Sequence, residues 1–316
     1  MTEKITWDKS HLLGLKDLSR EDIEIILNSA RSFKEVSKRQ IKKVPALRGK
    51  TVVNLFFESS TRTRTSFEIA AKRLSADLVN FSSNISSLNK GETFLDTLKN
   101  LEAYSVDMFI VRHAHSGAAK YLSENTSASV INAGDGQNEH PTQALLDMFT
   151  VQENLGQLSG LKVAIIGDIF HSRVARSNIW GFSKFNSDVW VCGPTTLIPK
   201  YFESLPVKIT YDMKQALDGA DVVIMLRIQN ERQQSQFFPS LREYRQYFTL
   251  GEDKVKFLKN TALVLHPGPV NWDIDISSSL KSRMQPLILE QVTNGLAVRM
   301  AVIYILMEKR HYEFID

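Results

Sequence analysis

Residues 51–68 read Thr51-Val-Val-Asn-Leu-Phe-Phe-Glu-Ser-Ser-Thr-Arg-Thr-Arg-Thr-Ser-Phe-Glu68. The first part, residues 51–57, is short and mostly apolar, which is typical of a strand buried on both faces of a parallel sheet. The second part is polar and passes into a helical pattern of apolar residues that reaches Leu74. A buried strand that leads through a polar turn into a helix is the basic unit of α/β proteins. This stretch therefore predicts the α/β class.

The same alternation repeats along the rest of the chain. Further buried strands are predicted at Asp107–Arg112, Ser129–Asn132, Lys162–Gly167, Asp188–Cys192, Asp221–Arg227 and Ala262–His266. Helical patterns precede or separate them. One opens with the capping-box sequence Ser19-Arg-Glu-Asp22, and another runs from Pro141 to Asn154. Strands that alternate with helices in this way favour parallel sheets.

The length of 316 residues fits about two domains of ordinary size. The short segment 155–160, Leu-Gly-Gln-Leu-Ser-Gly, is the expected junction. We predict a first domain at residues 1–150 and a second at 151–293, each a parallel sheet flanked by helices. A last helix at about 294–316 is expected to pack back on the first domain. In open parallel sheets, ligands bind beyond the carboxyl ends of the strands, so the active site is expected in the cleft between the domains.

Composition excludes several classes of protein. Hydrophobic residues make up 43% and charged residues 23%, which is ordinary for a globular protein and excludes disordered and fibrous chains. The net charge of +4 comes without a long basic run, so we expect no nucleic-acid partner. The first 12 residues do not resemble a signal peptide and no long apolar window follows, so no membrane span and a cytoplasmic location are expected. The single cysteine, Cys192, excludes an internal disulfide and a multi-cysteine zinc site.

The polar turn after the first strand has the features of an anion site. Ser60, Thr61 and Thr63 supply hydroxyl donors, while Arg62 and Arg64 supply forked donors that match phosphate oxygens. The helix that starts here adds free N–H groups. A helix cap would use only one hydroxyl, so the surplus predicts phosphate binding. The chain lacks a Walker loop and the later glycines of a dinucleotide fingerprint, so the ligand is expected to be a small phosphorylated compound.

Five further motifs follow this turn in a fixed order. They are Lys90-Gly-Glu92, Arg112-His113, His140-Pro-Thr-Gln143, Gly167-Asp168 with Arg173, and His266-Pro-Gly-Pro269. With Ser60-Thr-Arg-Thr-Arg64, the series resembles the transcarbamoylases over essentially the whole chain. The resemblance implies transfer of the carbamoyl group of carbamoyl phosphate to an amine acceptor, without a cofactor.

The resemblance also implies roles for single residues. The residues that would bind carbamoyl phosphate are Ser60, Thr61, Arg62, Thr63, Arg112, His140, Gln143 and the backbone of Gly268 and Pro269. The residues that would bind L-aspartate are Lys90, Arg173, Arg227 and Gln229. Lys90 would reach into the site of a neighbouring subunit, which implies a homotrimer with shared active sites. A regulatory chain or a partner enzyme of pyrimidine synthesis is compatible with the sequence.

The reaction needs no covalent intermediate, because the amine can attack the carbamoyl carbon directly. The developing oxyanion then needs donors, and the leaving phosphate needs neutralising charge. Arg112, His140 and Thr63 suit the oxyanion, with His140 as a neutral donor rather than a base. Arg62, with the helix N-terminus behind it, suits the phosphate.

The main alternative is an ornithine-specific transcarbamoylase. Such a pocket should offer acidic groups to the cationic acceptor and a cysteine in the late motif, which here reads His266-Pro-Gly-Pro269. Two arginines, Arg173 and Arg227, instead suit a dicarboxylate. Lys90 and Gln229 also favour aspartate.

Other classes of protein fit the sequence less well. An anion-binding protein without activity would be expected to lose Arg112 or His140, and a dehydrogenase would need the missing glycines. His113 and His115 form a His-x-His pair without a nearby third ligand, so no metal site is expected. Trp272 stands where some relatives carry a basic residue, and no effect follows from the sequence alone.

Overall fold

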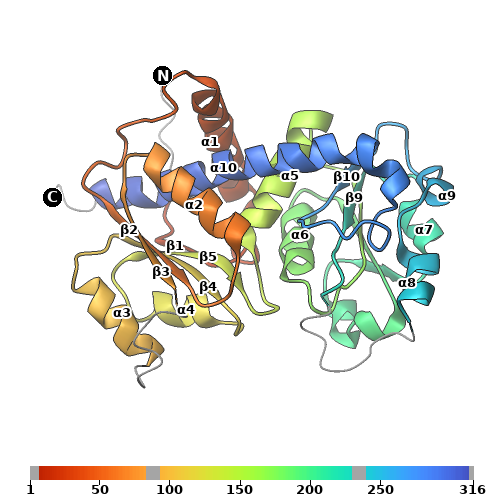
Figure 1. Ribbon diagram of the computed structural model, residues 1–316, viewed down its shortest axis with the longest axis horizontal. Helices are drawn as coiled ribbons and strands as arrows, with labels where there is room; N and C mark the ends of the chain where they lie inside the picture. The colour runs from red at the N-terminus through yellow and green to blue at the C-terminus, as the bar shows by residue number, and fades with distance from the viewer. Residues whose placement is uncertain (1–6, 83–92, 230–239, 313–316) are drawn as a thin grey trace. The chain divides into compact units, whose positions relative to one another are not determined.

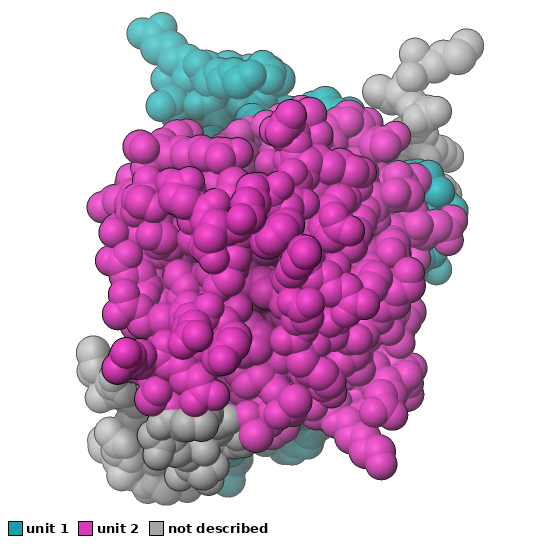
Figure 2. Space-filling model, turned by 90° about the vertical axis from the view of Figure 1, so that its right-hand side faces the viewer, with its two compact units in different colours: residues 1–145, 293–316 teal, residues 146–292 magenta. Residues whose placement is uncertain are grey.

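The structure is a computed structural model that describes residues 7–82, 93–229 and 240–312. Within these residues the chain forms two five-stranded sheets of parallel strands, flanked by helices (Figure 1). The predicted α/β class is confirmed. The chain divides into two compact units (Figure 2). Unit 1 comprises residues 1–145 and 293–316, and unit 2 comprises residues 146–292.

The sheet of unit 1 has the strand order β1-β5-β4-β2-β3. Its strands are β1 (His11–Leu12), β2 (Thr51–Phe56), β3 (Asp77–Ser82), β4 (Met108–His113) and β5 (Ser129–Asp135). Its helices are α1 (Arg20–Lys38), α2 (Thr61–Arg73), α3 (Phe94–Glu102), α4 (Ala118–Ser123) and the start of α5 (Pro141–Leu155). The central strands β2, β4 and β5 are almost wholly buried, as their apolar sequences predict.

The sheet of unit 2 has the order β10-β9-β6-β7-β8. Its strands are β6 (Lys162–Ile166), β7 (Asp188–Cys192), β8 (Lys208–Thr210), β9 (Val222–Met225) and β10 (Leu263–Leu265). Its helices are α6 (Arg173–Ser183), α7 (Met213–Leu217), α8 (Leu241–Phe248), α9 (Glu252–Val255) and the first part of α10 (Lys281–Tyr312). A buried apolar cluster joins this sheet to α7 and α8.

Three strands were not predicted, and all three lie at sheet edges. β1 and β8 have only two and three residues, and β3 is largely exposed, with polar residues at three of its six positions. Edge strands are commonly short or polar, so they lack the apolar run that marks a buried strand. The capping box predicted at the start of α1 is confirmed, since Ser19 and Asp22 each accept the other's backbone N–H.

The predicted start of the last helix, near residue 294, is wrong. α10 begins at Lys281 and continues through Pro286. Proline there removes one hydrogen bond close to the helix start, which the rest of a 32-residue helix can tolerate. Among the described residues, the stretch Ser278–Glu308 has the length and apolarity of a membrane span, but 61% of the 18-residue apolar window within it is buried. Such burial is typical of a core helix.

Candidate active site

Three adjacent strands of unit 1 carry the predicted carbamoyl phosphate residues. β4 lies between β2 and β5, and the chain leaves β2 towards β3 on one side but returns to β4 on the other. A sheet binds ligands at such a reversal of strand order, beyond the carboxyl ends. Ser60 follows β2, Arg112 is the last residue but one of β4, and His140 follows β5. Phe56 is paired in register with Arg112, so the first two of these ends meet.

The N-terminus of α2 is built for an anion. Ser60 is the N-cap residue, yet its side chain makes no capping hydrogen bond, and the first turn contains no acidic residue. In contrast, α1 and α3 begin with capping boxes that contain aspartate. Arg62 and Arg64 stand at the positive end of the helix dipole, an unfavourable place for a cation unless an anion binds there. Thr63 is buried in the same turn.

Arg112 is a buried cation at the end of β4, with 9% of its surface exposed. One guanidinium nitrogen, Nη1, donates to the backbone oxygen of Ala133 at 3.1 Å. The other, Nη2, lies 3.5 Å from Oε1 of Glu58. Glu58 therefore orients Arg112, a role that the sequence did not suggest. Its only signal there is an acidic residue placed directly before a turn of hydroxyls and cations.

His140 and Gln143 are buried at the start of α5. The loop that delivers them is braced by Glu139, whose carboxylate accepts the backbone N–H groups of Leu15 and Lys16 at 2.7 and 3.2 Å. A buried carboxylate that accepts two backbone N–H groups is well stabilised. Glu139 thus fixes the residue that directly precedes His140.

The same loop is closed from its other end by Asn132 and Asp135. The Asn132 amide donates to Asp135 at 2.7 Å and to the backbone oxygen of Leu13 at 2.8 Å. Asp135 in turn accepts the N–H of Glu139 at 3.2 Å. The side chains of Asn132, Asp135 and Glu139 are at most 5% exposed. The loop is therefore held by a satisfied polar network, which suits a preorganised donor site.

Unit 2 repeats the reversal of strand order. The chain runs from β6 through β7 to β8, then returns to β9 on the other side of β6, with β10 beyond it. Ile166 pairs in register with Met225, so the carboxyl ends of β6 and β9 meet. β6 leads to Arg173 at the start of α6, and β9 leads to Arg227. The two predicted carboxylate-binding arginines thus follow neighbouring strands at the reversal.

The loop before Arg173 is held by a buried pair that the sequence did not assign. Asp168 Oδ1 lies 2.8 Å from Nδ1 of His171, and both residues are at most 2% exposed. The other carboxylate oxygen accepts the N–H of Gln229 at 3.2 Å, and the Gln229 amide donates to the backbone oxygen of His171 at 3.1 Å. These bonds tie the segment after β9 to the segment after β6. Arg173 itself is 5% exposed, in a first turn without acidic residues.

The turn after β10 contains a cis bond between Gly268 and Pro269. The N–H of Gly268 donates to Nδ1 of His266 at 2.8 Å. Nε2 of that ring therefore carries the proton, and it lies 3.1 Å from Oδ2 of Asp275. The structure thus places every predicted site residue except Lys90, which lies outside the described residues. The individual roles of these residues stay predictions.

Comparison with known proteins agrees with this arrangement. Residues 10–153 match the carbamoyl-P binding domain of the aspartate/ornithine carbamoyltransferases, and residues 159–306 match their Asp/Orn binding domain. The chain belongs to the aspartate/ornithine carbamoyltransferase family. It is 55% identical over 300 residues to the aspartate carbamoyltransferase catalytic subunit of Syntrophus aciditrophicus, covering 95% of this chain and 98% of that one. It is 56% identical to the Syntrophomonas wolfei protein of the same name, with 95% and 96% covered.

Solved structures of this family share the fold. Aspartate transcarbamoylase from Trypanosoma cruzi, in complex with N-(phosphonacetyl)-L-aspartic acid, superposes with a TM-score of 0.84 at 28% identity, covering 93% of this chain and 94% of that one. The catalytic subunit of M. jannaschii aspartate transcarbamoylase gives 0.82 at 32% identity, with 96% and 99% covered. The same Trypanosoma cruzi enzyme has been solved with carbamoyl phosphate and aspartate, and with carbamoyl aspartate and phosphate.

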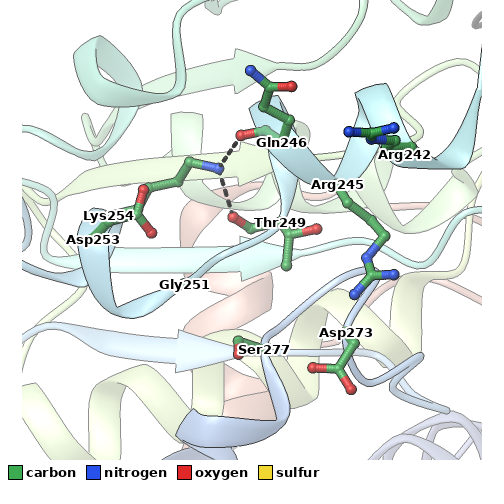
Figure 3. A pocket seen from close by; sticks show the side chains of 9 residues that line it. All are labelled: Arg242, Arg245, Gln246, Thr249, Gly251, Asp253, Lys254, Asp273 and Ser277. Carbon is green, nitrogen blue, oxygen red and sulfur yellow. Dashed lines mark hydrogen bonds between the residues drawn. The ribbon is translucent and has the colours of Figure 1, made fainter.

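A pocket of about 380 Å³ in unit 2 contains none of the transcarbamoylase site residues. It lies on the α8 and α9 side of the unit (Figure 3). Lys254 there already donates to the backbone oxygens of Gln246 and Thr249 at 2.9 and 2.8 Å. Arg245 points towards Asp273. Two of its three cations, Lys254 and Arg245, thus already face acceptors of the chain itself, so we place the chemistry at the strand ends.

His113 and Trp272, to which the sequence assigned no role, both have structural partners. His113 Nδ1 accepts the backbone N–H of His115 at 2.9 Å, and burial, followed by the charge of the neighbouring His115, lowers the pKa of His113. His113 is therefore expected to be neutral near pH 7. In the described part of the chain, no three His, Cys, Asp or Glu side chains cluster as metal ligands would. Trp272 packs on the unit 2 core, with the Lys281 ammonium 5.6 Å from its ring centre.

Proposed function

We propose that the chain transfers the carbamoyl group of carbamoyl phosphate to the amine of L-aspartate, giving N-carbamoyl-L-aspartate and phosphate. The reaction is an early step of pyrimidine synthesis. One observation carries the proposal. The helices α2 and α6 follow β2 and β6 at the two reversals of strand order, and their first turns contain arginine but no acidic residue. His140 directly precedes α5, whose first turn also has no acidic residue. Both substrates are anions, and these are the places where the fold offers positive potential.

The donor binds to unit 1. Ser60, Thr61 and Arg62, with the N–H groups of the first turn of α2, hold the phosphate. Arg112, His140 and Thr63 donate to the carbamoyl oxygen, whose negative charge grows as the amine attacks. Arg112 is already fixed by Glu58 and Ala133, so little reorganisation is needed when that charge develops. The bond from the carbamoyl carbon to the phosphate oxygen then breaks, the departing phosphate takes the proton that the amine loses, and its remaining negative charge lies beside Arg62.

The acceptor binds to unit 2. Arg173 and Arg227 each pair with one carboxylate of aspartate, and Gln229 is held beside them by Asp168 and His171. Ornithine carries an ammonium group where aspartate carries its second carboxylate, so two arginines would repel it. The curated relatives at 55% and 56% identity are named for aspartate, which also disfavours ornithine.

The assembly that we propose is a homotrimer in the cytoplasm, in which Lys90 completes the site of a neighbouring subunit. Inactive Lys90→Ala chains and inactive Arg62→Ala chains, mixed and reassembled, should then regain activity, because some sites would combine intact residues from both. Hybrids that stay inactive would refute the sharing of sites. Sedimentation equilibrium of the wild type would give the number of subunits independently.

The function is tested by supplying carbamoyl phosphate with either aspartate or ornithine. Phosphate release and the identity of the product are followed together. Carbamoyl aspartate from the wild type, with activity lost in Arg62→Ala, is the expected result. Product from ornithine alone would overturn the acceptor assignment but leave the phosphate site intact. Product from neither amine would refute the proposed reaction.

A further inference from the structure

A buried carboxylate in α5 has no part in the substrate contacts described above. Asp147 is fully buried, and its oxygens accept hydrogen bonds from two side-chain amides. Asn178 donates to Oδ2 at 3.0 Å, and Gln291 donates to Oδ1 at 2.7 Å. The other end of the Gln291 amide, Oε1, accepts the backbone N–H of His266 at 3.0 Å. These four residues all belong to unit 2.

The donors at the two ends of the Gln291 amide give this chain of hydrogen bonds a direction. The amide turns its NH₂ group towards Asp147, whose oxygens accept, and its oxygen towards the N–H of His266, which can only donate. The flipped amide would place an oxygen against a carboxylate and an NH₂ group against an N–H. In a site that excludes water, both contacts would be costly. His266 N–H is the first backbone donor beyond β10, so Gln291 binds the backbone where the strand ends.

The side chain of His266 also makes hydrogen bonds that fix its position. The His266 ring accepts the Gly268 N–H and donates to Asp275, as described above. Asp275 Oδ2 also accepts the N–H of Asn271 at 2.9 Å, which closes the far side of the turn. His266 and Asp275 are 2% and 0% exposed. The backbone of Gly268 and Pro269 is therefore fixed through His266, whose backbone is in turn fixed by Gln291 and Asp147.

We propose that Asp147 and Gln291 are positioning residues, which hold His266 so that the Gly268–Pro269 backbone meets the carbamoyl end of the substrate. This inference rests on the proposed function. Asp147 lies four residues after Gln143 in α5, so the helix that carries a predicted donor contact also anchors the turn. A turn that is misplaced by a fraction of an ångström disturbs the geometry of reaction more than the binding of the phosphate. Loss of the hydrogen bonds from Asp147 through Gln291 to His266, which we call the relay, therefore lowers kcat and leaves the KM for carbamoyl phosphate nearly unchanged.

The experiment reverses the polarity of the relay. Gln291→Glu places a second carboxylate against Asp147, and Asp147→Asn leaves amide groups facing amide groups. Each single variant is expected to lower kcat by on the order of 10- to 100-fold. In the double variant, the new amide at position 147 donates to the new carboxylate at position 291 and still accepts from Asn178. That carboxylate also accepts the backbone N–H of His266. The double exchange keeps the same set of side-chain groups and retains all three hydrogen bonds described above, so kcat should return to within about threefold of the wild type.

A control on the same helix separates positioning from stability. Thr150 is fully buried and donates within α5 to the backbone oxygen of Leu146 at 2.7 Å, away from the turn. Thr150→Val should lower the Tm and keep kcat within about twofold of the wild type. All variants are compared by Tm and by initial rates on the folded, full-length protein.

Single variants that fold and keep the wild-type kcat would overturn the proposal. A double variant no more active than either single variant would overturn it too, even if a single variant fails to fold. Both results presuppose a wild type that makes carbamoyl aspartate. A wild type that makes none would instead refute the proposed function.

Discussion

Replacing Arg112 by methionine should separate catalysis from folding. Methionine keeps most of the length of the arginine stem and can fill the same buried space, but it removes both the charge and the donors. The lost contacts include the hydrogen bond to Ala133 and the 3.5 Å ion pair with Glu58. Because the Glu58 side chain is 23% exposed, water can solvate its carboxylate once Arg112 is removed. The buried backbone oxygen of Ala133 loses this donor, so the free energy of unfolding should fall by about 1–2 kcal/mol.

The effect on turnover should be much larger. One preorganised donor to a developing oxyanion contributes about 3–4 kcal/mol to the transition state, which corresponds to a loss of roughly 100- to 1,000-fold in kcat. The proposed function assigns the donor's phosphate mainly to α2, so the KM for carbamoyl phosphate should rise much less. It assigns aspartate to unit 2, so the KM for aspartate should be nearly unchanged.

The assay measures initial rates of carbamoyl aspartate formation with each substrate varied in turn, beside a urea unfolding curve. Arg73→Met is the matched control, because Arg73 also donates from unit 1, to Ser37 at 2.8 Å, but lies outside the predicted site. Its kcat should stay at the wild-type value. If Arg112→Met kept its kcat and only raised the KM for carbamoyl phosphate, Arg112 would bind ground state and transition state equally, and its role at the oxyanion would be refuted.

Three further predictions concern stability and reactivity. Burial raises the pKa of the Cys192 thiol to about 12, so the native protein should resist a maleimide at pH 8 and react after unfolding; labelling of the native state would contradict this. Burial would raise the pKa of Glu102, but hydrogen bonds, led by that from Lys99, outweigh it and lower the pKa from 4.5 to about 2. Its stabilising effect is present above pH 4.5 and lost as pH falls towards 2, so the advantage of wild type over Glu102→Gln in urea should shrink over that range. In Gly14→Ala the new methyl group would collide with the Glu139 carboxylate, which should lower the Tm and raise the KM for carbamoyl phosphate; an unchanged KM would show that the loop before His140 does not depend on Glu139.

The features that the sequence predicted are those that neighbouring residues determine. β2 and α2 were predicted from one continuous stretch, because a buried strand and a helix start leave their marks within a few residues. The cations at the start of α2 could be recognised for the same reason. The edge strand β3 could not be predicted, since half of its residues are polar and it is stabilised by pairing with β2 along six residues, which its own sequence does not indicate.

The residues that support the site were not predicted, because their partners lie far away along the chain. Gln291 and Asp147 are 144 residues apart in sequence, and each on its own is an ordinary polar residue in a helical pattern. The pair between Asp168 and His171 is local, but its bond to Gln229 spans 61 residues. The residues next to them in sequence do not indicate that these side chains are buried or that they bond to distant partners.

Residues at the predicted site and buried residues that support it should respond differently to mutation. Arg62 lies exposed at the start of α2, and the proposed function gives it a role in binding phosphate, so its loss should reduce activity and leave the Tm almost unchanged. Residues such as Asp147 and Asp168 are fully buried, and their loss leaves donors without acceptors, so activity and Tm should fall together. A plot of the change in kcat against the change in Tm should therefore separate the two groups. If Arg62 variants fell on the line of Asp147 variants, the cations at the helix starts would be structural, and the anion-binding role of α2 would have to be abandoned.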